Sequence, residues 1–251
     1  MNHSWIVLIA ALLAAACDAG SSASVRPAEE VADAFTVAPG DFAVEPCGSE
    51  ANAPCILLHA GGKSFLFGAP AGLSRDIPPD RFVNLDGALL FSLLPRDIEG
   101  LDEVRNRGWR AGRADPLIVA GPEGTGELLD ALNLAFEQPD ALSFVDEGAP
   151  RGGFDAALLR GGVEILSRAL VFDTGDVKIY GTSGQGPYVT YRIGYLDLSG
   201  NWHDLTLQPC AGPQSPPADY GGAPQSETLI ACSGDSGDVD WPLTYPVKIS
   251  G

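Results

Sequence analysis

Apolar runs and amphipathic segments alternate in the first half of the chain. Runs typical of short buried strands lie at residues 56–58, 64–67, 89–94 and 117–120. The first two runs flank a turn that contains two glycines, which predicts a β-hairpin. Residues 97–108 and 125–137 instead carry apolar side chains at helical spacing, which predicts two amphipathic helices. Alternation of strand and helix is typical of an α/β fold.

The pattern changes after Asp140, where strand-like runs follow one another through glycine-rich turns. These runs lie at residues 163–172, 177–180, 189–195, 203–207 and 227–231. No repeat with a period of about 20 to 50 residues is present, so a solenoid is not expected. We therefore predict one α/β domain over residues 42–251, with a strand-rich second half.

The N-terminus has the features of an export signal. Residues 5–16 are apolar and end in three alanines. This run is too short for a transmembrane helix and has the length of a signal-peptide core. We expect residues 1–16 to be a signal peptide and residues 17–41 to be a tether with little apolar material to pack.

Cys17 follows this segment directly. The arrangement resembles the lipobox of bacterial lipoproteins, in which the chain is cut before the cysteine and the thiol is acylated, but Ala14 stands where leucine is usual. The resemblance implies a lipid-anchored protein on the periplasmic side, with the bacterial membrane as a partner. Simple secretion, with Ala14 and Ala16 as the cleavage site, is the alternative.

The chain has five cysteines, and lipidation of Cys17 leaves an even set of four. These are Cys47, Cys55, Cys210 and Cys232. Four cysteines allow three disulfide connectivities, and proximity in the sequence favours Cys47–Cys55 and Cys210–Cys232. A structural zinc site would call for paired C-x-x-C knuckles, which the sequence lacks.

Charge and histidine content exclude several functions. The chain has 33 acidic against 15 basic residues, a formal charge of −18. Nucleic-acid binding needs clustered Lys and Arg that displace counterions, so no nucleic-acid partner is expected. Only three histidines are present, His3, His59 and His203, and His3 lies in the signal segment. A mechanism that needs several imidazoles is therefore excluded for the mature protein.

One stretch carries a resemblance to a known family. It contains Ile-Glu-Gly-Leu at 98–101, Arg-Gly-Trp at 107–109 and Pro-Leu-Ile-Val-Ala-Gly-Pro-Glu-Gly-Thr at 116–125. This stretch resembles the metallo-β-lactamase superfamily, in particular the ribonuclease Z-like hydrolases and their exported lipoprotein relatives. The resemblance implies an αββα sandwich. We expect a partial or degenerate one, because the chain ends at Gly251, before the last helices of the family's second half.

The family holds zinc or a similar ion with the motif H-x-H-x-D-H-x-x-G-L, and the ion activates a bound water. Aligned on Gly100-Leu101, the resemblance places the first four ligands at Ser92, Leu94, Arg96 and Asp97, and a later histidine near Gln185. Of these side chains, only the Asp97 carboxylate is of a type that could bind a metal ion. We therefore expect no metal or other cofactor and a non-catalytic binding or interaction module, a pseudoenzyme that uses the inherited cleft.

A hydrolase, metal-dependent or serine-dependent, is the alternative. Residues 232–237 resemble the C-x-G-D-S-G loop of trypsin-like peptidases, in which Ser236 would act with His59 and Asp155. Residues 172–175 resemble the Asp-Thr-Gly turn of aspartic peptidases, although a plain hairpin turn explains them more simply. We interpret His59 as a turn residue and His203 as a half-exposed strand residue.

Overall fold

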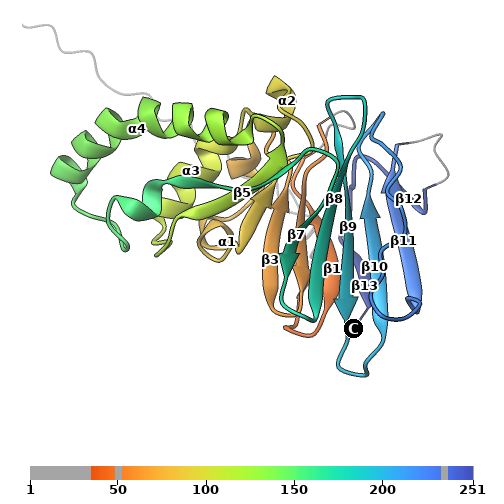
Figure 1. The fold of residues 1–251 in the computed structure, drawn as a ribbon. Helices are drawn as coiled ribbons and strands as arrows, with labels where there is room; N and C mark the ends of the chain where they lie inside the picture. The colour runs from red at the N-terminus through yellow and green to blue at the C-terminus, as the bar shows by residue number, and fades with distance from the viewer. Residues whose placement is uncertain (1–34, 49–52, 233–236, 251) are drawn as a thin grey trace, which may run out of the picture. The chain divides into compact units, whose positions relative to one another are not determined.

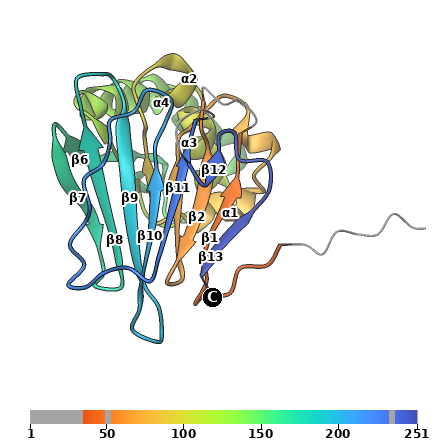
Figure 2. The ribbon, with the colours of Figure 1, turned by 90° about the vertical axis from the view of Figure 1, so that its right-hand side faces the viewer.

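The computed structural model describes residues 35–48, 53–232 and 237–250. The chain divides into two units, 1–35 and 36–251, and the second contains every helix and strand described below. Two sheets form its centre, with seven and six strands. Figures 1 and 2 show the sheets face to face, with the helices gathered on one side.

The first sheet has the strand order β13-β1-β2-β3-β4-β5-β6. Neighbours from β13 to β3 are antiparallel, whereas β3 to β6 run parallel. The strands are β1 (Phe42–Pro46), β2 (Ile56–Ala60), β3 (Lys63–Phe67), β4 (Gly87–Leu89), β5 (Leu117–Pro122), β6 (Leu159–Ile165) and β13 (Val247–Ser250). The last strand of the chain thus pairs with the first.

The second sheet has the order β12-β11-β10-β9-β8-β7. Its strands are β7 (Arg168–Asp173), β8 (Val177–Ser183), β9 (Val189–Leu196), β10 (Trp202–Leu207), β11 (Ser226–Ala231) and β12 (Val239–Asp240). Strands β7 to β10 are antiparallel, and β10 to β12 are parallel. Apolar side chains at alternate positions, such as Tyr191, Ile193 and Leu205, face the first sheet and form the core between the sheets.

Helices cover the other face of the first sheet (Figure 1). They are α1 (Pro79–Val83), α2 (Pro95–Ile98), α3 (Leu101–Arg110) and α4 (Thr125–Glu147), with short 3-10 turns η1 (Leu73–Arg75) and η2 (Asp155–Ala157). Phe82, Val104 and Leu129 from the helices pack with Leu66 and Val119 of the sheet in a second core. Helices and strands in this unit therefore form three layers.

An extended segment, residues 208–225, lies on the outer face of the second sheet, and we call it the strap. Thr190 Oγ1 donates to the Pro213 carbonyl at 2.6 Å, and Arg168 Nη2 donates to that of Pro217 at 3.1 Å. Farther along, the Tyr220 ring stacks on Trp202 with centroids 4.9 Å apart. Within the described residues, the strap occupies the face where the fourth layer of an αββα sandwich would lie.

The predicted fold class is confirmed: the unit is α/β, with strands throughout its second half. The predicted hairpin is β2–β3, and the runs 177–180, 189–195, 203–207 and 227–231 correspond to β8 to β11. Asp173-Thr174-Gly175 is indeed a hairpin turn, because the Gly175 N–H bonds Asp173 Oδ1 at 2.7 Å.

Two strand predictions were wrong in part. The run 89–94 is a strand only up to Leu89, since the Ser92 hydroxyl accepts the Leu94 N–H at 3.0 Å and turns the chain into α2. Leu90 and Phe91 are buried without being in a strand. The run 163–172 is two strands, β6 and β7, which belong to different sheets.

The helix limits also differ from the prediction. The segment 97–108 is interrupted at Gly100, where a Cβ would lie 2.2 Å from the Pro70 carbonyl oxygen, so the chains approach too closely for a side chain. Helix α4 continues past Pro139 to Glu147, because buried Asp140 pairs with buried Arg105 of α3.

Candidate functional site

The segment that follows β4, residues 90–98, ends in the short helix α2 and lies where the two sheets meet; we call it the 90–98 loop. The Val189 N–H of β9 donates to the Phe91 carbonyl at 2.7 Å. The Tyr191 hydroxyl, fully buried, donates to the Leu90 carbonyl at 2.7 Å. These two hydrogen bonds attach the loop to the start of β9. The loop contains all four residues that the resemblance assigned as the first metal ligands.

Ser92 and Asp97 are both buried and are bonded to each other. The Ser92 hydroxyl donates to Asp97 Oδ2, while the other carboxylate oxygen of Asp97 has no hydrogen-bond partner within the described residues. Burial raises the pKa of Asp97, and the Ser92 hydrogen bond and the Arg96 charge only partly oppose it. The buried part of the loop therefore contains a hydrogen-bonded serine–aspartate pair.

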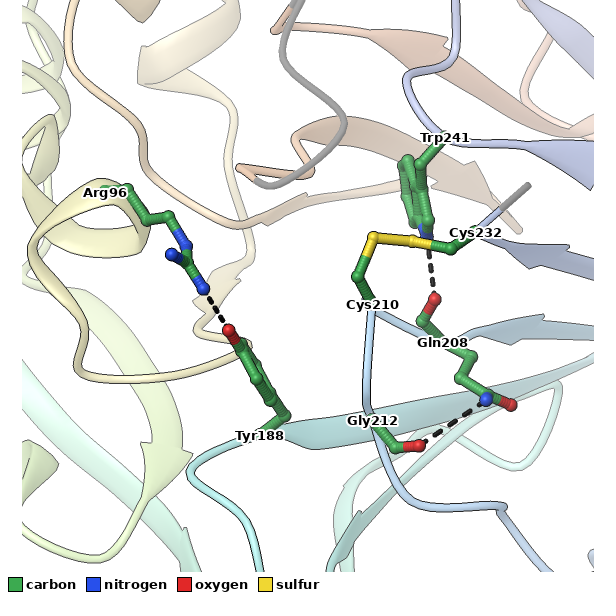
Figure 3. The surroundings of a disulfide bond; sticks show 7 residues. All are labelled: Arg96, Tyr188, Gln208, Cys210, Gly212, Cys232 and Trp241. Atoms are coloured by element: carbon green, nitrogen blue, oxygen red, sulfur yellow. Dashed lines mark hydrogen bonds between the residues drawn. A yellow bond between two sulfur atoms is a disulfide. The ribbon is translucent and has the colours of Figure 1, made fainter. Parts of the chain in front are cut away.

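Arg96 points out of the same loop toward the start of β9. Its Nη2 donates to the Tyr188 hydroxyl, and its guanidinium carbon lies 5.9 Å from the centre of the Tyr188 ring (Figure 3). The contact joins residues 92 positions apart in the sequence. It therefore fixes the distance between the loop after β4 and the segment that leads into β9.

These residues do not fit the zinc site that the resemblance implies. Leu94 has no donor atom, Asp97 is bonded to Ser92, and Arg96 brings a permanent positive charge where a dication would sit. Gln185 is exposed in the β8–β9 loop. Across the described part of the chain, no three His, Cys, Asp or Glu side chains are grouped in a way that could hold a metal ion.

A cleft of about 400 Å³ lies beside this loop. Six apolar residues from four segments of the chain line it, namely Leu93, Leu94, Pro122, Ile165, Leu166 and Pro187. Glu123 and Ser183 add polar groups. Leu93 and Leu94 precede Arg96 closely, and Pro187 precedes Tyr188, so the Arg96–Tyr188 contact links two walls of the cleft.

The serine alternative from the sequence is not assembled in the described residues. Ser236 lies outside them. His59 is on β2, where Nε2 lies 2.8 Å from Glu45 Oε1 and Nδ1 lies 3.1 Å from Ser64 Oγ. Asp155 is in η2, next to Ala156 and Ala157, which pack on Trp109.

His203 is buried, not half-exposed as predicted. Its Nδ1 lies 2.8 Å from Ser226 Oγ, and its Nε2 lies 3.0 Å from Asp197 Oδ2. Sequence reasoning missed both partners and also Tyr188, because each contact depends on which strands become neighbours. Trp202-His203-Asp204 gave no local sign that a serine 23 residues later would bond the imidazole.

The two predicted disulfides are confirmed. Cys47 pairs with Cys55 at a Cα–Cα distance of 5.0 Å, and Cys210 pairs with Cys232 at 5.3 Å. Figure 3 shows the second disulfide beside Trp241, whose indole N–H donates to the Gln208 carbonyl at 2.8 Å. The start of the strap is therefore held by a covalent bond and an indole hydrogen bond.

No protein-family model matches the chain, and no curated protein matches it. Solved structures do. The metallo-β-lactamase fold protein YhfI from Bacillus subtilis is 14% identical, with 76% of this chain and 70% of that chain covered and a TM-score of 0.46. The short form of human tRNase Z is 16% identical, with 75% and 76% covered and a TM-score of 0.48.

The metallo-β-lactamase GOB-18 from Elizabethkingia meningoseptica is 9% identical, with 74% of this chain and 69% of that chain covered and a TM-score of 0.41. All three likenesses concern the fold and carry nothing about activity. YhfI and GOB-18 are a metallo-β-lactamase fold protein and a metallo-β-lactamase, members of the superfamily that residues 98–125 resemble.

Proposed function

We propose that the chain is an exported, lipid-anchored binding module that holds a small apolar ligand in the cleft beside the 90–98 loop and does not carry out metal-dependent hydrolysis. One observation carries this proposal. Arg96 bonds Tyr188 while Asp97 bonds Ser92, so the polar side chains of the degenerate metal positions are engaged with protein partners.

Electrostatics support the absence of a metal. A dication near the Arg96 guanidinium would be repelled, and a water-excluded setting strengthens that repulsion. The chain's two histidines outside the signal segment, His59 and His203, contact Glu45, Ser64, Asp197 and Ser226 and do not line the cleft. The imidazoles that a hydrolytic zinc site uses are therefore committed elsewhere.

Size and lining support a small apolar ligand. The cleft volume of about 400 Å³ falls in the lower part of the usual range for small-molecule sites. Six of its lining residues are Leu, Ile or Pro, and Leu166 is 67% exposed at the mouth. Burial of such a side chain against a ligand is favourable by roughly 1.5–3 kcal/mol.

The proposed anchor rests on Cys17 and its apolar leader. Both disulfides suit an oxidising compartment outside the cytoplasm. Among the described helices, none is long and apolar enough to cross a bilayer. Mass spectrometry of the mature N-terminus tests the anchor: we expect an acylated Cys17, and an unmodified terminus released into the medium would favour simple secretion instead.

Elemental analysis of the purified full chain tests the metal proposal. We expect well under one equivalent of zinc, iron or manganese, and no hydrolysis of bis(p-nitrophenyl) phosphate above background. One or more retained equivalents, with hydrolysis that Asp97→Ala abolishes, would establish the metal-dependent hydrolase instead.

Fluorescence titration with the neutral apolar probe N-phenyl-1-naphthylamine tests the cleft. We expect saturable binding to one site and at least about tenfold weaker affinity in Leu166→Asp, because a carboxylate at the mouth must be desolvated. Leu134→Asp is the matched control, since Leu134 is 71% exposed on α4 and does not line the cleft. Equal affinity in both variants, or no saturable binding, would refute the assignment of this cleft.

A further inference from the structure

Ser226, His203 and Asp197 form a hydrogen-bonded series at the far end of β9 from the cleft. Asp197 directly follows the end of β9, and Tyr188 directly precedes its start. The imidazole of His203 lies between the other two, with Nδ1 2.8 Å from Ser226 Oγ and Nε2 3.0 Å from Asp197 Oδ2. The three residues come from β10, the start of β11 and the β9–β10 turn.

The acidic member of this series is rigidly oriented. Asp197 Oδ1 accepts the backbone N–H groups of Ser199 at 2.8 Å and Asn201 at 2.9 Å. The other oxygen is therefore left to face His203. These bonds, the one from His203 foremost, lower the pKa of Asp197 to about 2, so the carboxyl is ionised at neutral pH.

An ionised Asp197 fixes the tautomer of His203. The carboxylate can only accept, so Nε2 carries the proton, and Nδ1 keeps its lone pair to accept the Ser226 O–H. This is the arrangement by which a histidine removes a proton from a serine while an acid orients the ring and stabilises the imidazolium. Here the two ring nitrogens exchange the roles they have in chymotrypsin-like enzymes.

The other histidine provides an internal comparison. His59 also lies between a serine and a carboxylate, Ser64 and Glu45. However, Glu45 Oε1 is shared with Arg81, whose Nη2 is 3.5 Å away. The oxygen that orients the His59 ring is therefore shared with a guanidinium. In the described residues no Lys or Arg forms an ion pair with Asp197.

The surroundings of Ser226 leave it accessible. Ser226 is half-buried, and Gln225 and Glu227 on either side of it are exposed. Strand β12 pairs with β11 only at Ile230 and Ala231, so no described strand covers the outer edge of β11 beside Ser226. An acyl substrate can therefore approach Ser226 along this edge.

We propose that Ser226 is a nucleophile activated by His203 and oriented through Asp197, forming a second site that cleaves simple carboxylic esters. Ser226 Oγ attacks the ester carbonyl carbon while its proton passes to His203 Nδ1. The bond to the alcohol oxygen then breaks, and the imidazolium returns the proton to that oxygen. Water attacks the acyl-serine by the same route, which releases the carboxylic acid and restores the serine. This site is independent of the cleft and of the function proposed for it.

Labelling of the folded full chain with a fluorophosphonate probe tests this site. We expect one adduct, mapped by peptide mass spectrometry to Ser226, and slow hydrolysis of p-nitrophenyl acetate. Ser226→Ala should abolish both. His203→Gln and Asp197→Asn should each slow labelling by about 100-fold, the usual scale of a general base.

Ser64→Ala is the matched control, because it removes the serine of the other histidine series, and its labelling should equal that of the wild type. Ser226→Ala removes a single hydroxyl, and circular dichroism of each variant shows whether it is folded. Two results would overturn the proposal: no adduct at Ser226 in the wild type, or an adduct whose rate is unchanged in folded His203→Gln or Asp197→Asn.

Discussion

The Tyr220 hydroxyl donates a hydrogen bond of 2.9 Å to Asp204 Oδ2, the oxygen that also accepts from Arg192 Nε at 2.7 Å. Tyr220 belongs to the strap, whereas Asp204 and Arg192 belong to neighbouring strands of the second sheet. All three are buried. Burial and the Asp204 charge raise the pKa of Tyr220 well above its ordinary value, so the hydroxyl stays protonated and remains a donor.

Tyr220→Phe should loosen the strap. A hydrogen bond to a charged acceptor contributes roughly 1.5–3 kcal/mol, so we expect the free energy of unfolding in urea to fall by about 2 kcal/mol. Limited proteolysis should also cut faster within residues 208–225. Tyr245→Phe is the control, because Tyr245 is 60% exposed. Equal losses in the two variants would show that the Asp204 contact does not hold the strap.

The sequence pattern predicts the strands of the second sheet, but it does not predict the strap that covers them. Strands β8 to β10 alternate apolar and polar positions, which reveals their buried face. The strap has no such period. Its attachment depends on single contacts, such as Thr190 to the Pro213 carbonyl, that span 23 residues. Its position follows only once the sheet has formed.

The candidate site was predictable in the same partial way. The family resemblance, aligned on Gly100-Leu101, assigned Ser92, Leu94, Arg96 and Asp97 to one set of ligand positions, and these residues do share the 90–98 loop. Tyr188 was not foreseen as the partner of Arg96, since the two approach each other only when β9 packs beside that loop. The local sequence pattern therefore identifies the 90–98 loop, whereas the hydrogen-bond partners of its side chains depend on which strands pack beside it.

Substitution of Asp140, the partner of Arg105, should lower the free energy of unfolding strongly. Both side chains are buried, and the bond joins α3 to the second half of α4. Asp140→Ala would leave a buried guanidinium unpaired, which costs roughly 3–5 kcal/mol. Glu147→Ala breaks the exposed Arg110–Glu147 pair of the same two helices and should cost about 1 kcal/mol or less. Urea unfolding of both variants measures the difference, and similar losses would contradict it.

Removal of the Cys210–Cys232 disulfide should destabilise the unit more than removal of Cys47–Cys55. The two bridges join residues 22 and 8 positions apart, and a longer closed loop restricts the unfolded chain more. We expect losses of about 3 and about 2.5 kcal/mol for the paired Cys→Ser variants. Thermal unfolding of each variant, compared under the same conditions, measures the order. The reverse order would show that native-state contacts outweigh loop entropy here.

Acid should remove a specific contribution of Asp197 to stability. The His203 and backbone hydrogen bonds lower its pKa from 3.8 to about 2 in the folded chain. A carboxyl group whose pKa is lower in the folded state than in the unfolded state stabilises the folded state at every pH above its unfolded-state pKa. This stabilisation is lost as the pH falls through the folded-state pKa.

The melting temperature of Asp197→Asn should therefore lie below that of the wild type by a constant amount above about pH 5, and the gap should narrow between about pH 4 and pH 2. Asp130→Asn, at an exposed position of α4, controls for the change in net charge. Protonation of Asp197 in the wild type should make it resemble the asparagine variant. If the difference in melting temperature instead stays constant down to pH 2, the negative charge of Asp197 does not contribute to holding the β9–β10 turn and His203 in place.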